Sequence, residues 1–155
     1  MITTPARLEI GLNAAIVAVD DGEPLILTVA DDAGEAAQAE PALPFGPFDP
    51  FRHRTLEIGL RAWVEQQTAL RLGYVEQLYT FGDRGRYARP GDEGPHVVSV
   101  GYLALTRIVD RGEGGEGRGG TTSGALARAG AAFDHWYDHF PWEDWRDRKS
   151  TRLNS

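Results

Sequence analysis

The sequence predicts an α/β (α+β) protein, and a few patterns carry that prediction. Residues 8–30 contain two apolar runs on either side of Asp21-Gly22, a turn signal, and therefore predict a β-hairpin. Residues 55–67 have apolar side chains at helical spacing, which predicts an amphipathic helix. Residues 74–81 are rich in aromatic and branched residues and residues 96–107 alternate, so both segments predict further strands.

The helix is expected to begin after Thr55, whose hydroxyl can accept a free backbone N–H at the helix start. Gly73 breaks the helical pattern beyond its end. Residues 43–51, before the helix, contain three prolines and one glycine and predict irregular structure. One face of the helix is expected to carry Leu56, Leu60, Trp63, Val64 and Gln67.

Residues 1–109 are the expected domain core, and the connections within it are polar. Residues 31–40 are acidic and alanine-rich, which favours a loop with a helical tendency, and residues 83–95 form a polar loop that contains arginines. Residues 110–124 contain seven glycines and predict a flexible link. Residues 125–146 are predicted to be a helical segment, helical as far as Phe140 and ended or bent by Pro141.

Composition excludes several classes of site. The chain has 155 residues, no cysteine and a formal net charge of −7. It therefore lacks disulfides, thiolate metal sites and a cysteine nucleophile, and it should repel a phosphate backbone. The sequence contains no run of about 18 apolar residues, so it predicts no membrane-spanning helix, and no signal peptide is visible. We therefore expect a cytoplasmic protein without a membrane partner.

The last nine residues, Asp147–Ser155, read DRKSTRLNS. This string matches the translation of a common short-read sequencing adapter, so we leave it out of fold reasoning, as one would a tag. We therefore expect the natural protein to continue past Arg146 into a further domain.

Five strings extend the predicted element order into a family resemblance. "LPFGPF" precedes the helix, "QTAL" comes at its end, "YVEQLYTFGDRGR" and "HVVSVGYLAL" cover the two following strands, and "PWEDWR" comes near the end of the chain. Residues 8–146 resemble the Nudix-related transcriptional regulators of NAD metabolism of the NadQ and NrtR type. The resemblance implies a Nudix-like α/β/α sandwich with a mixed sheet, followed in the family by a winged-helix DNA-binding domain. A homodimer is left open.

The catalytic signature of active Nudix enzymes is degenerate in this chain. That signature reads G-x5-E-x7-R-E-U-x-E-E-x-G-U, with U apolar, and we align its end on Ala69-Leu70. Apart from the apolar positions Val64 and Leu70, nothing matches. The signature positions are occupied by Phe48 for the first glycine (with Gly46 close by), Arg54 for the first glutamate, Ala62-Trp63 for the arginine–glutamate pair, Gln66-Gln67 for the double glutamate and Ala69 for the late glycine.

This degeneracy predicts binding without cleavage. Mg²⁺ prefers carboxylate and phosphate oxygens, and its catalytic task is to neutralise charge and activate water. Glutamine at positions 66 and 67 can hydrogen-bond a ligand but supplies neither charge nor a general base. We therefore expect no cofactor and no catalytic residue. The alternative is a Nudix hydrolase with a displaced Mg²⁺ site on Glu57 and Glu65, with Glu76 as a third acid, although the first two equally suit a solvated helix face.

The arginine loop and nearby aromatic residues are the candidate ligand site. Guanidinium groups at Arg84 and Arg86 suit phosphate contacts, although they could simply pair with Asp83 and Asp92. The expected ligand is a nucleotide-like metabolite of the ADP-ribose, NAD or ATP class. Phe48, Tyr79 and Phe81 could stack on its rings, the alternative for Tyr79 and Phe81 being core packing. With Gln66 and Gln67, the predicted ligand-binding residues are Phe48, Gln66, Gln67, Tyr79, Arg84 and Arg86.

Two histidines near the end have the spacing of helical zinc ligands. His135 and His139 are four residues apart, but no third ligand is evident, so we interpret the segment as an amphipathic linker helix. The predicted function is a catalytically inactive, effector-sensing domain of a regulator of NAD biosynthesis, with DNA bound by the further domain. The alternatives are the hydrolase described above and an interaction domain with an empty pocket.

Overall fold

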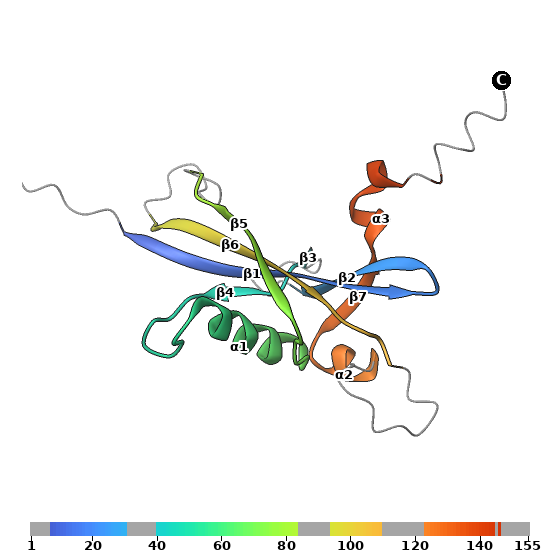
Figure 1. Cartoon of the computed structure of the whole chain (residues 1–155), viewed down its shortest axis with the longest axis horizontal. Coiled ribbons are helices and arrows are strands. Elements are labelled where there is room, and N and C mark those ends of the chain that lie inside the picture. Colours follow the sequence, from blue (N-terminus) through green and yellow to red (C-terminus); the bar gives the residue numbers. More distant parts are fainter. Residues whose placement is uncertain (1–6, 31–39, 84–93, 110–122, 145, 147–155) are drawn as a thin grey trace, which may run out of the picture.

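A seven-stranded sheet forms the body of the protein in the computed structural model, which describes residues 7–30, 40–83, 94–109, 123–144 and 146 (Figure 1). Parallel and antiparallel pairs both occur in it, so the predicted mixed sheet is confirmed. The strands are β1 (Leu8–Asp20), β2 (Glu23–Ala30), β3 (Pro41–Ala42), β4 (Phe45–Pro47), β5 (Val75–Phe81), β6 (His96–Leu105) and β7 (Ala131–His135). The helices are α1 (Leu56–Thr68), α2 (Ser123–Arg128), α3 (Trp136–His139) and the 3₁₀ helix Pro141–Glu143.

The long central strand β1 organises the sheet. On one side it pairs in parallel with β6, from Leu8 opposite His96 to Val17 opposite Leu105. On its other side β1 pairs first with β4 and then with β2, both antiparallel. The full order is β3-β2-β1-β6-β5, with β7 also on β2. β1 is therefore the element to which the strands before and after α1 are both attached.

The predicted hairpin turn is confirmed. Asp21 and Gly22 both have positive φ, 48° and 75°, between strands β1 and β2. A two-residue turn with this backbone follows the right-handed twist of the flanking strands, and Asp-Gly is among the sequences that adopt it most readily.

The core lies between one face of β1 and helix α1. Alternate β1 residues, including Leu12 and Ile16, are fully buried, as are Leu60 and Val64 of α1. The predicted helix start is also confirmed, since Thr55 Oγ1 accepts a hydrogen bond from the Ile58 N–H at 3.1 Å. The helix ends earlier than Gly73, because Ala69 adopts the left-handed conformation after Thr68.

The prediction of irregular structure across residues 43–51 is wrong for its centre. Phe45, Gly46 and Pro47 form strand β4, with Gly46 opposite Leu12 of β1. Prolines are tolerated here because β4 is an edge strand, where a missing backbone N–H leaves no ladder bond broken. The Pro44 carbonyl still accepts a hydrogen bond from Ala14 N at 3.1 Å.

The prediction of one helix across residues 125–140 is also wrong. Gly130 has a φ of 79° and ends the short helix α2. Residues Ala131–His135 then pair with β2 as strand β7, which buries Ala131 and partly buries Phe133. This segment forms a strand despite its helical propensity, because the edge of β2 offers it backbone hydrogen bonds and apolar contacts. In the described ranges, no helix has the length and apolar character that a membrane crossing requires.

One core residue gives the stability of this fold a pH dependence. Burial, and then the negative charge of Glu57, raise the pKa of Tyr102 above its ordinary value of 10.0. Because the folded state holds the phenolic proton more tightly than the unfolded state, the stabilisation is complete below pH 10 and is lost as pH rises through the raised pKa. We expect urea unfolding to show a steeper loss of stability above pH 10 in the native chain than in Tyr102→Phe. Parallel pH profiles for the two chains would contradict this assignment.

Candidate functional site

Helix α1 holds strand β4 through two side chains, Trp63 and Gln67, at positions where the Nudix signature has glutamates. Trp63 Nε1 donates to the Pro47 carbonyl at 2.8 Å. The Gln67 amide pairs with the backbone of Phe45, donating to its carbonyl at 2.6 Å and accepting from its N–H at 3.1 Å. Between these bonds, Gly46 lies against the Trp63 indole so closely that a Cβ would overlap the ring. We call this set of contacts the α1–β4 clamp.

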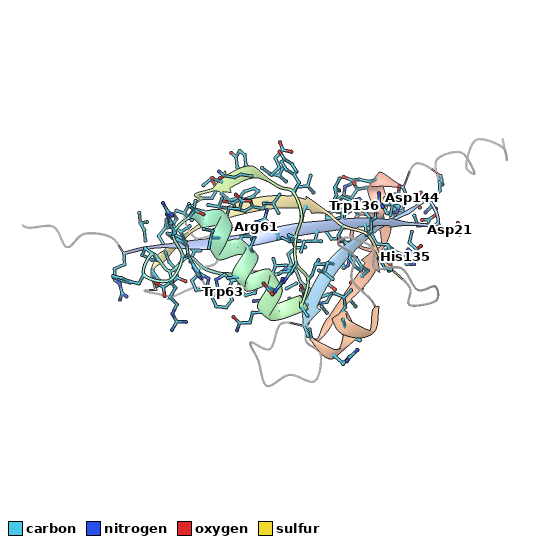
Figure 2. All side chains as sticks on the ribbon, turned by 60° about the horizontal axis from the view of Figure 1, so that its bottom comes forward. Asp21, Arg61, Trp63, His135, Trp136 and Asp144 are labelled. Atoms are coloured by element: carbon cyan, nitrogen blue, oxygen red, sulfur yellow. The ribbon has the colours of Figure 1, made fainter. Side chains whose placement is uncertain are left out.

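Arg61 leaves α1 on a different side from Trp63 (Figure 2) and fixes the connection to β5. Its guanidinium donates to the carbonyls of Leu72 and Gly73 at 2.6 and 2.7 Å. The same group bonds Glu57 Oε1 from both Nε and Nη2, at 3.1 and 2.8 Å. Glu57 therefore serves as the anion for a structural arginine.

The three glutamates of the alternative metal site do not converge. Glu65 bonds Arg71 beyond the helix end at 3.1 Å, whereas Glu57 is held by Arg61 at the helix start. The two positions are about 12 Å apart along the helix axis, while Mg²⁺–oxygen bonds are about 2 Å long. Glu76 lies opposite Leu103, on the sheet face turned away from α1. Across the described ranges, no group of three or more His, Cys, Asp or Glu side chains is arranged to hold a metal ion.

The predicted ligand-binding residues have separate surroundings. Gln66 is exposed on α1, Gln67 is part of the clamp, and Phe48 packs partly buried against the core. Arg84 and Arg86 lie outside the described residues, so their predicted phosphate contacts stay predictions. The structure thus brings Gln67 close to β4 but does not bring the four described residues, Phe48, Gln66, Gln67 and Tyr79, to one point.

The core-packing alternative is wrong for Tyr79. Its side chain is 64 % exposed on β5, and its ring meets that of Phe81 edge to face at 4.8 Å. Phe81 is partly buried, which fits packing better. Strand β5 is the last strand of the sheet order, and no described helix lies over this part of it, which explains why an aromatic residue there can stay exposed.

A cavity of about 380 Å³ lies at the opposite end of the molecule, among residues of β7, α3 and the chain that follows. Arg146 is part of the cavity lining and forms ion pairs with Glu23 and Asp144, which also line the cavity. The Arg146 guanidinium carbon lies 4.9 Å from the centroid of the Tyr137 ring. The hydrogen bond from Arg146 holds the pKa of Asp144 below its usual range. None of the predicted ligand-binding residues that the structure describes lines this cavity.

The histidine pair is not a helical zinc motif. His135 ends strand β7, whereas His139 belongs to α3, so the two do not share a helix face. The Nε2 atom of His139 lies 3.0 Å from Asp134 Oδ2, which also accepts a hydrogen bond from Thr28 at 3.1 Å. This arrangement attaches α3 to the sheet.

Sequence comparison leaves the chain without a match, because neither the protein-family models nor the curated proteins match it. Solved structures do match. The chain is similar to the Nudix domain of Shewanella oneidensis NrtR, complexed with ADP ribose, with 21 % identity and a TM-score of 0.63 over 89 % of this chain and 79 % of that one. This chain has the Nudix fold.

Two further solved structures are similar to this chain in fold. NrtR from the same organism, complexed with a 27mer DNA, gives 21 % identity and a TM-score of 0.60 over 83 % of this chain and 52 % of its own. The chain thus spans about half the length of that NrtR chain. The Ap4A hydrolase of C. elegans gives 10 % identity and a TM-score of 0.55, with 92 % of each chain covered.

The residues of this Nudix helix do not fit the Mg²⁺ that the fold implies. Trp63 and Gln67 stand at aligned glutamate positions, and both direct N–H donors at backbone carbonyls of β4. A cation at these positions would face N–H donors in place of carboxylate oxygens, which are the ligands it requires. The clamp instead satisfies those carbonyls without a metal.

Sequence reasoning missed the clamp and the role of Arg61. The sequence did contain a signal for the clamp. Trp63 and Gln67 lie four residues apart and therefore on one helix face, and Gly46 in "LPFGPF" marks a place where another group can approach the backbone closely. Asn13 was also missed, although it is a polar residue in the middle of an apolar strand.

The close approach of Trp63 to Gly46 predicts a packing-sensitive site. Gly46→Ala would place a methyl group well within 3.0 Å of the indole. We expect destabilisation of about 1–3 kcal/mol, typical of overpacking, measured by urea unfolding. Gly73→Ala is the matched control, because a Cβ there meets nothing within 4 Å. Equal unfolding midpoints for the two variants would show that the indole does not press on Gly46.

Adjacent glutamines allow the clamp to be tested with one kind of substitution. Gln67→Glu replaces the amide donor with a carboxylate facing the Phe45 carbonyl, and we expect a loss of about 1–3 kcal/mol. Gln66→Glu, on an exposed side chain, should change stability by no more than about 0.5 kcal/mol. Urea unfolding at neutral pH measures both. A Gln67→Glu chain as stable as Gln66→Glu would mean that the amide pairing contributes nothing.

Proposed function

We propose that this chain is a sensing domain that binds a nucleotide-type metabolite of the ADP-ribose, NAD or ATP class without hydrolysing it. The observation that carries the proposal is the α1–β4 clamp. Where hydrolysis would need carboxylates, Trp63 and Gln67 direct their N–H groups at the Pro47 and Phe45 carbonyls. The remaining glutamates of the helix, Glu57 and Glu65, are paired with arginines of the same chain.

The ligand class is supported by likeness to the NrtR Nudix domain, which is complexed with ADP ribose. We further propose that Arg84 and Arg86 contact the phosphates of the ligand, since guanidinium groups match phosphate oxygens in charge and geometry. No cofactor is part of this proposal.

We place the domain in a cytoplasmic regulator of NAD biosynthesis. NrtR is complexed with a 27mer DNA, and this chain spans about half of that protein's length. With a net charge of −7, the chain itself is poorly suited to a phosphate backbone, so we assign DNA contact to a further domain. A ligand alters DNA affinity only if it binds the two states of such a regulator with different affinity.

The hydrolase alternative draws support from the Ap4A hydrolase of C. elegans, which has the same fold. It requires a metal site other than the α1 positions. The divergence of Glu57, Glu65 and Glu76 weighs against the site drawn from those residues.

A calorimetric titration of the chain with ADP-ribose and Mg²⁺, followed by chromatography of the mixture, tests the proposal. We expect heat that saturates and ADP-ribose recovered intact, because no carboxylate at the α1 positions is free to position a metal and water. Release of AMP and ribose 5-phosphate would establish turnover and overturn the non-hydrolytic assignment. Absence of any heat with ADP-ribose, NAD or ATP would overturn the sensing function.

A further inference from the structure

The sheet face away from α1 carries a row of residues that the function so far does not use. Asn13 of β1 lies opposite Phe45 of β4 on one side and opposite Gly101 of β6 on the other. Gly101 in turn lies opposite Tyr79 of β5. Residues that are directly opposite in a sheet share a face, so the row reads Phe45, Asn13, Gly101, Tyr79 across neighbouring strands.

The orientation of this row follows from the adjacent one. Leu12 and Gly46 face α1, as the burial of Leu12 and the closeness of Gly46 to Trp63 require. Because successive strand residues point to opposite faces, Asn13 and Phe45 point away from the helix. Helix α3 packs on β2 and β7, so no described helix lies over this row.

Asn13 presents an oriented amide at the centre of the row. Its Nδ2 donates to Oγ of Ser99, a buried neighbour on the same sheet face, so this hydrogen bond fixes the orientation of the amide. Its Oδ1 lies 3.4 Å from where a Cβ of Gly101 would stand, which places that oxygen over the glycine. Among the described residues, no donor forms a hydrogen bond with Asn13 Oδ1, and the second N–H of Nδ2 is not used by the bond to Ser99. The amide therefore offers one acceptor and one donor side by side.

Aromatic side chains stand at both ends of the row. Phe45 is 50 % exposed and Tyr79 is 64 % exposed, large fractions for apolar rings. Three strand spacings separate their backbones, about 14 Å, with Asn13 and the side-chain-free Gly101 between them. The Phe81 ring borders this space, since its Cε2 lies 3.7 Å from where a Cβ of Gly101 would stand. A flat ring resting there would meet an aromatic face and the amide together.

We propose that this row binds the adenine ring of the ligand, with Asn13 hydrogen-bonding to its edge and Tyr79, the more exposed of the two rings, stacking on it. An asparagine amide is complementary to adenine, accepting from the N6 amino group and donating to N7. Stacking of the base on an exposed aromatic ring does not engage the phosphates of the ligand, so these stay available for arginine contacts. The proposal rests on the proposed nucleotide-sensing function and names the part of the ligand that this face recognises.

The experiment compares ADP-ribose with its hypoxanthine analogue, which has a carbonyl oxygen in place of the amino group. The native chain should bind ADP-ribose roughly tenfold or more tightly than the analogue, because a bidentate amide contact discriminates by about that factor. Asn13→Leu should lose this preference. Tyr79→Ala should weaken both ligands about tenfold, while Tyr74→Ala, another exposed tyrosine outside the row, should leave both affinities unchanged.

The outcomes separate this inference from the function on which it rests. Binding of ADP-ribose with unchanged affinity and base preference in Asn13→Leu and Tyr79→Ala would overturn the adenine site and leave the sensing function standing. A native chain that binds neither ligand would overturn both. If Asn13→Leu does not fold, because Ser99 Oγ loses its partner, the comparison of Tyr79→Ala with Tyr74→Ala decides, since both side chains are exposed.

Discussion

The attachment of β4 to α1 is the constraint on which the rest of this structure depends. β4 has only three residues and two prolines next to or within it, too little for a strand that stands alone. It is held on one side by β1 and on the other by Trp63 and Gln67. The same contacts orient α1 over Leu12 and Ile16, so helix, edge strand and core are set by one group of hydrogen bonds.

The clamp also links fold and chemistry. Side chains at positions where an enzyme of this fold would hold its metal are here part of the framework. A carboxylate only accepts hydrogen bonds, so it could not serve the Phe45 and Pro47 carbonyls, which need a donor. An amide and an indole N–H meet that need, which turns a site for an ion into a joint between two elements.

Local patterns predicted the larger elements and missed the smaller ones. The hairpin, α1, β5 and β6 each carry their own periodicity, so neighbouring residues suffice to predict them. Strands β4 and β7 exist because β1 and β2 have free edges, which is information held far away in the chain. Of the candidate site, the loss of the metal-binding glutamates was readable, but the exposure of Tyr79 and the engagement of Gln67 depend on which elements pack where.

The parallel pairing of β1 with β6 has a consequence for the time course of folding. Leu8 pairs with His96 and Val17 with Leu105, so the centre of the sheet joins segments 88 residues apart in the chain. Contacts this distant require the entropy of a long loop to be lost before they stabilise anything, which slows folding. During synthesis, the edge of β1 that pairs with β6 stays without its partner strand until the ribosome has released residue 105. A newly made chain therefore passes through a stage in which the Leu8–Asp20 hairpin strand can associate with other unfinished chains.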